Sequence, residues 1–348
     1  MGIALAPANG KGAGVALVKA GAREVYWGFH DDAWTRRFGS WTGVNRMSGF
    51  GSEANSLTFR ELLAQVRAVR AFEANTPSVR DAVALGLYCT FNAPHYSSEQ
   101  RRFIEHEYLP ALAEAGLSGI IVSQPDLIAS ARDAGLSAVA STMCAVYNEA
   151  LARFYVEAGA RRIILPRDMT LDEIEAVITA VPEASYEVFL MRNGCMFADS
   201  HCLGLHRAGH PSLCRSLRAC TWQELPAHDA ANAAERDALD AHLQRRIASG
   251  TAYRERFHLG ACGQCALWRL ERAGVAAYKV VGRCDRLDEL KADVALTAAN
   301  IAIARACETQ DEYWQHMRRP TGLRALCAED GLSCYYPDVR VPSRGQRA

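Results

Sequence analysis

Apolar residues along the chain gather in eight short runs, which alternate with longer segments that have helix-like spacing. Five of these runs follow an Ala-Gly step, as at Ala20-Gly21 and Ala158-Gly159. Glycine suits the end of a helix because it adopts a left-handed backbone without steric cost. The runs are apolar at nearly every position, which predicts parallel strands that are buried on both faces beneath covering helices.

Eight strands that alternate with helices predict an α/β fold, a (β/α)8 TIM-like barrel. We expect the strands at residues 3–6, 24–27, 83–91, 119–122, 137–140, 162–165, 186–191 and 275–281. The barrel is expected to occupy residues 1–300 and to include a cysteine-rich segment at 192–265. Residues 301–348 would then form a C-terminal extension and tail.

Three further segments carry predictions of their own. The alanine-rich periodicity from Asp285 to Gln315 predicts one long helix. Residues 227–249 are rich in Ala, Asp and Arg, which is typical of a solvated helix. The polar end of the chain, from Tyr335 to Ala348, predicts a mobile tail or a contact with a partner.

Polar residues at the ends of the predicted strands are the candidates for chemistry, because barrel active sites lie where strands give way to βα loops. Many such residues only cap the next helix. Three of the candidates are arginines, and guanidinium groups that converge on one mouth would bind a carboxylate or phosphate in bidentate fashion. The candidate catalytic residues are therefore Arg167, Arg283, Asn92, Arg192, Asp168 and Lys279.

Twelve cysteines occur in the chain, and six of them fall in one stretch. The first residues lack a basic segment followed by a full apolar segment, so we expect a cytoplasmic protein, in which clustered thiols bind metal more often than they form disulfides. Four of the six are expected to bind a metal centre: Cys195, Cys202, Cys214, Cys220, Cys262 and Cys265.

Thiolates without hard oxygen ligands suit zinc or an iron-sulfur cluster. A structural zinc site usually has two short-spaced pairs, and only Cys262-x2-Cys265 is such a pair, with His201, His206 and His210 nearby. The long spacings favour a cluster. Isolated cysteines on apolar segments, and the terminal Cys327 and Cys334, are more typical of packing residues, although a second site remains an alternative.

Composition bounds the partners of the protein. The 39 basic and 39 acidic residues give no dominant basic field, which makes nucleic acid the less expected substrate. No apolar run approaches the roughly 20 residues that a membrane span requires.

Several motifs, spread from about Leu5 to about Ala302, resemble the collagenase-like peptidase family, number thirty-two among the peptidases of unknown mechanism. They are residues 21–28, Arg46 with 55–58, 90–92, 140–142 with Asn148, 165–174, Glu187-Val188-Phe189 leading to Cys195-x6-Cys202, and 273–275 leading to 279–283. The resemblance implies a barrel that holds a [4Fe-4S] cluster on four cysteines, the first two matching Cys195 and Cys202. It also implies oxygen-independent hydroxylation, in some members of RNA bases and, in a two-protein pair, for ubiquinone synthesis.

This chain departs from the family pattern at three places. Residues 192–194 read Arg-Asn-Gly where the family usually has His-Gly-Ala, Asp168 stands for a glutamate, and Val281 stands for another. The segment after Cys202 is also short, so the third ligand is either Cys214 or Cys220, and Cys262 and Cys265 compete for the fourth. These changes indicate a divergent branch.

Two classes of function follow. The first is an iron-sulfur enzyme that hydroxylates a small anionic or aromatic molecule without O2, with an electron donor as a further partner. The second is a partner subunit, paired with a paralogous protein, whose cluster supports assembly or electron transfer. Peptide hydrolysis and RNA-base hydroxylation rank lower, and no His-Glu-x-x-His or Gly-x-Ser-x-Gly motif supports a peptidase.

Overall fold

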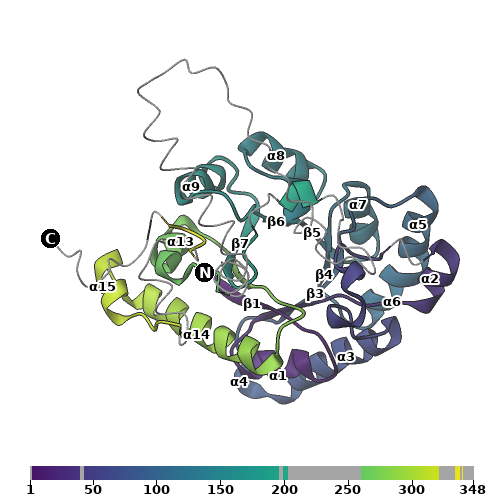
Figure 1. Cartoon of the computed structure of the whole chain (residues 1–348), viewed down its shortest axis with the longest axis horizontal. Coiled ribbons are helices and arrows are strands. Elements are labelled where there is room, and N and C mark those ends of the chain that lie inside the picture. Colours follow the sequence, from purple (N-terminus) through teal and green to yellow (C-terminus); the bar gives the residue numbers. More distant parts are fainter. Residues whose placement is uncertain are drawn as a thin grey trace, which may run out of the picture.

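Eight parallel strands form a closed barrel in the computed structural model, which describes residues 2–39, 43–195, 199–202, 260–320, 334–337 and 339. Neighbours in the chain are neighbours in the barrel, and the first strand pairs with the last. This confirms the predicted (β/α)8 architecture (Figure 1). The strands are β1 (Ile3–Pro7), β2 (Glu24–Trp27), β3 (Gly86–Phe91), β4 (Gly119–Val122), β5 (Ser137–Ala140), β6 (Arg162–Ile164), β7 (Ser185–Met191) and β8 (Ala277–Val280).

All eight predicted strands exist, with small differences at their ends. The third begins at Gly86 instead of residue 83, because Val83 is 65% exposed and precedes the buried run. Every residue of β2, β3 and β4 is buried. This burial confirms that the strands are covered on both faces.

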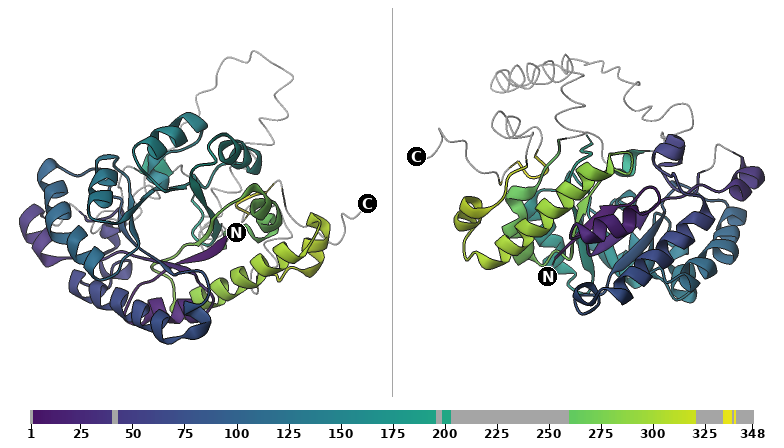
Figure 2. Two further views of the ribbon diagram at one scale, coloured as in Figure 1. Left: turned by 180° about the vertical axis from the view of Figure 1, so that it is seen from behind. Right: turned by 90° about the horizontal axis from the view of Figure 1, so that it is seen from below.

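Helices surround the barrel, as both views of Figure 2 show. Three of them begin with a capping box, in which Thr58, Ser97 or Thr170 exchanges hydrogen bonds with the residue three positions later. The helices are α1 (Ala13–Lys19), α2 (Asp32–Phe38), α3 (Phe59–Asn75), α4 (Pro77–Arg80), α5 (Ser98–Phe103), α6 (Leu109–Glu114), α7 (Asp126–Asp133), α8 (Glu149–Glu157), α9 (Leu171–Ala180), α13 (Leu267–Ala273), α14 (Leu287–Ala306) and α15 (Gln310–His316). Short helical turns are η1 (Ser48–Glu53), η2 (Ile104–Tyr108), η3 (Thr142–Cys144), η4 (Asp199–Cys202) and η7 (Gln264–Ala266).

The single long helix predicted from Asp285 to Gln315 is wrong, because the segment forms two helices, α14 and α15. Cys307 takes an extended backbone at the end of α14. Thr309 then starts α15, its side chain accepting a hydrogen bond from the backbone N–H of Glu312 at 3.1 Å. A threonine cap of this kind restarts the helix in a new direction, which alanine periodicity alone does not reveal.

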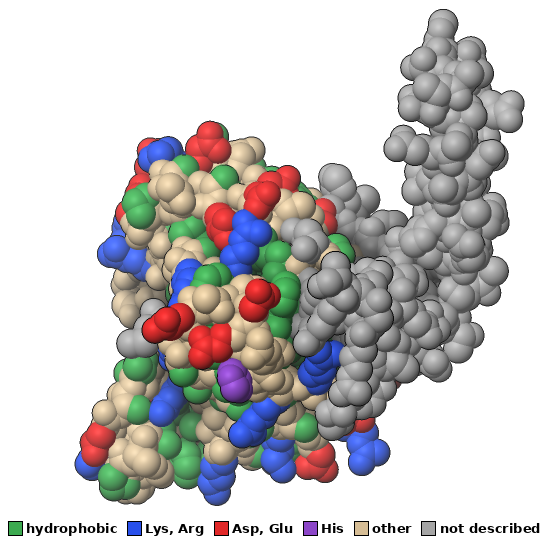
Figure 3. All heavy atoms as spheres, turned by 90° about the vertical axis from the view of Figure 1, so that its left-hand side faces the viewer, with side chains coloured by type: hydrophobic (Ala, Val, Ile, Leu, Met, Phe, Trp, Pro, Cys, Tyr) green, Lys and Arg blue, Asp and Glu red, His purple; other side chains and the backbone are tan. Residues whose placement is uncertain are grey.

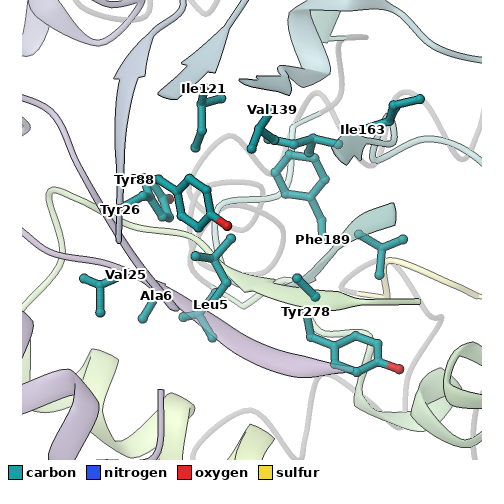
Figure 4. Packing of buried hydrophobic residues seen from close by; sticks show 14 of the residues in the cluster. Leu5, Ala6, Val25, Tyr26, Tyr88, Ile121, Val139, Ile163, Phe189 and Tyr278 are labelled. Atoms are coloured by element: carbon teal, nitrogen blue, oxygen red, sulfur yellow. The ribbon is translucent and has the colours of Figure 1, made fainter. Parts of the chain in front are cut away.

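Side chains alternate between the inside and the outside of the barrel. Tyr88 and Phe189 point inward among the strands, whereas Val25 and Tyr278 point outward toward the helices (Figure 4). The parallel registers place Glu24 and Lys279 on the inward face as well, since both pair with Leu5. Barrel interiors are dominated by branched aliphatic residues, so charged groups there are unusual.

The predicted tail is wrong at its start. Tyr335 and Tyr336 are buried against the end of β7. The backbone of Cys334 forms an isolated parallel β-bridge with that of Cys262. The backbone of Cys262 also forms an antiparallel β-bridge with Met191, the last residue of β7. The C-terminal extension therefore returns to the barrel at these residues.

Several predictions fall outside the described residues: Cys214, Cys220, His206, His210, Cys327 and the solvated helix at 227–249. Of the cysteine-rich segment 192–265, the structure describes 192–195, 199–202 and 260–265. None of the described helices is both long and apolar enough to cross a membrane.

Candidate functional site

Two arginines lie buried at the C-terminal mouth of the barrel. Arg167 follows β6 and Arg283 follows β8, and each is only 7% exposed. Burial raises the pKa of the Tyr26 hydroxyl on β2, and the positive charges of both arginines act to lower it. The strand-end positions predicted from the sequence therefore bring these two guanidinium groups to the same mouth.

Arg167 is compensated by a buried carboxylate. Its Nε and Nη2 donate to the two oxygens of Asp199 at 2.7 and 3.0 Å, and its guanidinium lies 4.2 Å from the centroid of the Phe189 ring. Arg46 donates to Asp199 Oδ1 at 2.8 Å, and Thr142 donates to Oδ2 at 3.0 Å. One carboxylate is therefore shared by two arginines and a threonine hydroxyl.

The electrostatics of Asp199 follow from this arrangement. Burial acts to raise the pKa of its carboxyl, but the positive charges of Arg167 and Arg46 outweigh burial and hold the pKa well below its usual range. Asp199 is therefore ionised at neutral pH and accepts hydrogen bonds only. It has no proton to give to a substrate, and its role is to hold the two arginines.

Arg283 has a different environment. Its Nη1 donates to Asn55 Oδ1 at 3.1 Å and to Thr90 Oγ1 at 3.3 Å, and its Nη2 donates to Asn45 Oδ1 at 3.4 Å. These partners are neutral, and no carboxylate in the described part of the chain pairs with this guanidinium. Burial lowers the pKa of Arg283 from its usual value, because no described acid offsets the cost of desolvation.

Gly28 makes room for Arg283. A Cβ atom at this position would lie 1.8 Å from Arg283 Nη1 and 2.1 Å from Asn55 Oδ1. Asn45 and Asn55 are linked by a 3.0 Å side-chain hydrogen bond. The position of the Arg283 guanidinium thus requires a glycine at residue 28, directly after β2, and the hydrogen-bonded amides of Asn45 and Asn55.

Below the mouth, the barrel interior holds a charged group of four residues, which we call the floor quartet: Glu24, Arg162, Glu187 and Lys279. Lys279 Nζ lies 2.5 Å from Glu187 Oε1 and 4.3 Å from the centroid of the Tyr26 ring. Arg162 Nη2 donates to Glu24 Oε1 at 2.8 Å, and Arg162 also lies 3.8 Å from Glu187 Oε2. Desolvation lowers the pKa of Lys279, and Glu187 opposes that shift.

The other predicted catalytic residues are divided. Asn92 belongs to the mouth, where its Oδ1 accepts from the Arg46 backbone N–H and its Nδ2 donates to Ser141 Oγ, both at 3.4 Å. Asp168 is exposed and accepts from Tyr147 at 2.8 Å. Lys279 lies in the floor quartet, beneath the mouth.

Arg192 does not converge with the other two arginines. It pairs with three carboxylates that lie on or just before α14: Asp285, Glu289 and Asp293. The reason is local, because Arg192 and Asn193 both adopt left-handed backbone conformations, with φ of 62° and 47°. Two such residues in succession turn the chain sharply at the end of β7.

The predicted metal ligands are only partly described. Cys195 is half-buried, two residues after Asn193, whose backbone carbonyl accepts from Arg167 Nη1. Cys202 ends the turn η4, and its side chain lies outside the description, as does that of His201. Cys262 is buried beside Met191, and the Cys265 backbone carbonyl accepts from Trp314 Nε1 at 3.0 Å.

Four functional residues of the mouth were not among the predicted catalytic set: Asp199, Arg46, Asn45 and Asn55. Asp199 was visible as the acid inside the Cys195-x6-Cys202 loop. Arg46 and Asn55 appeared only as family motifs. Asn45 and Asn55 lie in the connection between β2 and β3, where an amide gives no sign of which strand end it will reach.

The arrangement has the charge and shape to bind an anion above the charge-balanced floor quartet. Arg283 offers donors without a described counter-charge, and the compensated Arg167 sits next to the turn that carries Cys195. A carboxylate or phosphate matches the guanidinium fork in shape and charge.

Similar proteins include the tRNA hydroxylation protein P of Escherichia coli, which is 28% identical over 151 residues, covering 42% of this chain and 33% of that protein. Its counterpart from Haemophilus influenzae is 26% identical over 151 residues, covering 42% of this chain and 32% of the relative. The match thus spans about a third of the length of these relatives.

Among solved structures, the U32 peptidase Mk0906 is 12% identical with a TM-score of 0.40, covering 65% of this chain and 83% of that one. The sequence model of peptidase family U32 matches residues 13–319. That match includes seven of the eight strands, both arginines of the mouth and the cysteine-rich segment. The chain therefore belongs to peptidase family U32, as its motifs indicated.

Proposed function

We propose that this protein is an iron-sulfur-dependent hydroxylase that acts without O2 on a small organic molecule bearing an anionic group. The observation that carries the proposal is Arg283, a guanidinium that is 7% exposed and has only neutral partners among the described residues. A buried charge of this kind is costly unless a counter-charge joins it. A bound carboxylate would supply that charge.

The hydroxylation chemistry is supported by the relatives, which are named for tRNA hydroxylation. Replacing C–H by C–OH with oxygen from water releases two electrons and two protons. An electron-transfer partner must therefore take up the electrons, unless a donor metabolite delivers the oxygen already at the needed oxidation level. An iron-sulfur cluster would supply the electron transfer between substrate and partner.

The cysteines fit a cluster that needs ligands from several segments. Cys195 lies past β7 beside the mouth, and Cys262 lies next to the last residue of β7. The described residues alone hold no group of three or more metal-binding side chains. The proposed ligands are therefore Cys195 and Cys202, with one of Cys214 and Cys220 and one of Cys262 and Cys265.

RNA-base hydroxylation is the second candidate, and the names of the relatives favour it against the ranking drawn from net charge. The face that carries α9, α13 and α15 shows acidic and basic side chains interspersed (Figure 3). There Arg269 pairs with Asp172 and Glu175, and Arg305 pairs with Glu271. The described residues of this side of the barrel therefore offer no uniform basic surface.

The experiment begins with anaerobic purification and assays of iron, sulfide and zinc. About four iron and four sulfide atoms per chain are expected, and Cys195→Ser should remove them. Arg283→Lys should keep the metal and weaken binding of the anionic substrate by about 1.5–3 kcal/mol, since lysine keeps the charge but loses the fork. Stoichiometric zinc without iron would reject the cluster.

Product analysis then separates the two substrates. Cells with and without the gene are grown without O2, and small metabolites and digested tRNA nucleosides are compared by mass spectrometry. A hydroxylated metabolite that depends on the gene supports the proposal, whereas a missing nucleoside hydroxyl supports the RNA candidate. In a parallel culture supplied with ¹⁸O2, incorporation of the label into either product would contradict both candidates.

A further inference from the structure

Residues 334–336 form a short segment that returns from the C-terminal extension to the barrel mouth; we call it the return segment. The Tyr335 backbone N–H donates to the Cys262 carbonyl at 3.0 Å. The backbone of Cys262 in turn forms a β-bridge with Met191 at the end of β7. We propose that the return segment is part of the candidate site and that Tyr335 is a positioning residue for the turn that presents Cys195.

The side chain of Tyr335 reaches the turn directly. Its hydroxyl donates to the Arg192 backbone carbonyl at 2.5 Å, and its ring stacks on Phe189 with centroids 6.2 Å apart and planes 27° apart. Tyr335 is 7% exposed. Its hydroxyl thus holds the turn three residues before Cys195, the first cysteine of the predicted cluster.

The turn needs external support. Arg192 and Asn193 hold left-handed conformations at φ of 62° and 47°, which side chains other than glycine rarely adopt. Such conformations persist where the surroundings over-determine them. Here the Arg192 N–H donates to the Ala261 carbonyl at 2.6 Å, and the Arg192 carbonyl accepts from Tyr335. Both backbone groups of the first strained residue are therefore held from outside the turn.

The neighbouring contacts show that the return segment occupies a shaped seat. The Tyr336 hydroxyl donates to the Phe189 carbonyl at 2.9 Å. Its ring packs so closely on Gly263 that a Cβ atom at position 263 would lie 2.9 Å from the ring. Gly263 N–H in turn donates to the Leu190 carbonyl at 2.7 Å. A glycine beside Cys262 thus lets the C-terminal tyrosines close over the end of β7.

The consequence concerns the geometry of Cys195, three residues after Arg192. Without the Tyr335 hydroxyl, the Arg192 carbonyl loses its described side-chain donor. Arg167 still donates to the Asn193 carbonyl and Asn193 still donates to Asp285, so the turn is loosened at its first residue and the Cys195 thiol gains freedom to move. A metal ligand is held in place by such surrounding bonds. The link to a cluster rests on the proposed function, but the effect on the turn does not.

The test uses the full-length, metal-free protein under argon, with iodoacetamide as the probe and peptide mass spectrometry as the readout at Cys195. We expect Tyr335→Phe to raise the labelling rate at Cys195 about threefold, because the stacking remains and the hydrogen bond is lost. Tyr335→Ala should raise it about tenfold. The matched control is Tyr186→Phe, which removes a 2.7 Å hydrogen bond to the Val181 carbonyl beside the opposite end of β7 and should leave the rate unchanged.

An unchanged labelling rate in Tyr335→Phe, with thermal unfolding equal to wild type, would overturn the proposal. A rise in the Tyr186→Phe control of the same size would overturn it too, because the effect would then be a general loosening. If iron is present, Tyr335→Phe should shift the EPR signal of the reduced cluster at equal iron content. Absence of iron from every preparation would defeat the proposed function and leave the labelling result to decide the role of Tyr335.

Discussion

The floor of the barrel and its mouth differ in how their buried charges are paired. In the floor quartet, two acids meet two bases: Lys279 pairs with Glu187, and Arg162 pairs with Glu24. At the mouth, the Asp199 carboxylate pairs with Arg167 and Arg46, whereas the hydrogen-bond partners of Arg283 within the described residues are all neutral. Ion pairs thus fill the lower interior, while a cation without a described counter-charge lies at the end of β8.

The contrast separates structure from function. Removing one member of a balanced group of four costs stability, because its partner is left uncompensated. Arg283 is already buried without a described carboxylate, so its desolvation lowers the stability of the folded protein. Such a loss of stability at a single position is common in binding sites.

The largest effect is expected at the floor. Glu187→Gln leaves Lys279 and Arg162 without a shared carboxylate and should lower the free energy of unfolding by about 3–5 kcal/mol. The same substitution should lower the pKa of Lys279 further, because in the wild-type protein the Glu187 charge opposes the lowering by desolvation. Urea unfolding at pH 7 measures the first effect. The double variant Glu187→Leu with Lys279→Met should recover most of the loss, and a single variant as stable as wild type would show that the quartet is not structural.

Asp199→Asn should cost slightly less, about 3 kcal/mol at pH 7, because Arg46 remains partly exposed to water. Its pH dependence is distinctive. The folded pKa of Asp199 lies below the value of about 3.9 expected when unfolded, so its stabilisation is present above that value and is lost as pH falls through the folded pKa. Unfolding measured at pH 7, 5 and 3 should show the gap between variant and wild type narrowing at the lowest pH. A gap that stays constant would mean that the carboxylate charge contributes nothing.

The mouth should respond in the opposite sense. Arg283→Met removes a buried charge that has no described carboxylate, so stability should stay within about 1 kcal/mol of wild type or rise. Anion binding should be lost in the same variant. Thermal unfolding and a binding assay, run on one preparation, test the two halves together. A loss of stability as large as that of Glu187→Gln would erase the distinction between floor and mouth.

The smallest effect is expected outside the barrel. Glu289 is 49% exposed where it meets Arg192, and exposed ion pairs contribute roughly 0–1 kcal/mol. Glu289→Gln should therefore change stability by less than about 1 kcal/mol, and the change should shrink in high salt. A larger, salt-independent loss would place Arg192 with the buried charges.

The sequence predicted the fold well because local patterns decide it. Runs such as Gly119–Val122 are apolar at every position, and each of five runs follows a glycine that ends a helix. Strand ends then identify Arg167 and Arg283 as mouth residues, because a parallel barrel directs all its strand ends to one side. These inferences need no knowledge of distant contacts.

The remainder of the site depends on contacts between distant residues. Arg192 also follows a strand, but two left-handed residues turn it toward α14. Asn is often found in that conformation, but no local rule predicts it for Arg192. The sequence did not reveal the floor quartet, because its four charges lie on four different strands, one on each of β2, β6, β7 and β8. Tyr335 was read as tail because its neighbours in the chain are polar, whereas its partners Phe189 and Arg192 lie over 140 residues earlier.

The pairing of β1 with β8 has a consequence for how the chain is made. Ile3 finds its partner Ala277 only after 274 further residues have been added, which takes roughly 14–55 s at ribosomal rates of about 5–20 residues per second. Until then β1 has an open edge, which can pair with other chains. Ring closure is therefore a late, long-range event in the life of each molecule, and the mouth acquires Arg283 only when that closing strand arrives.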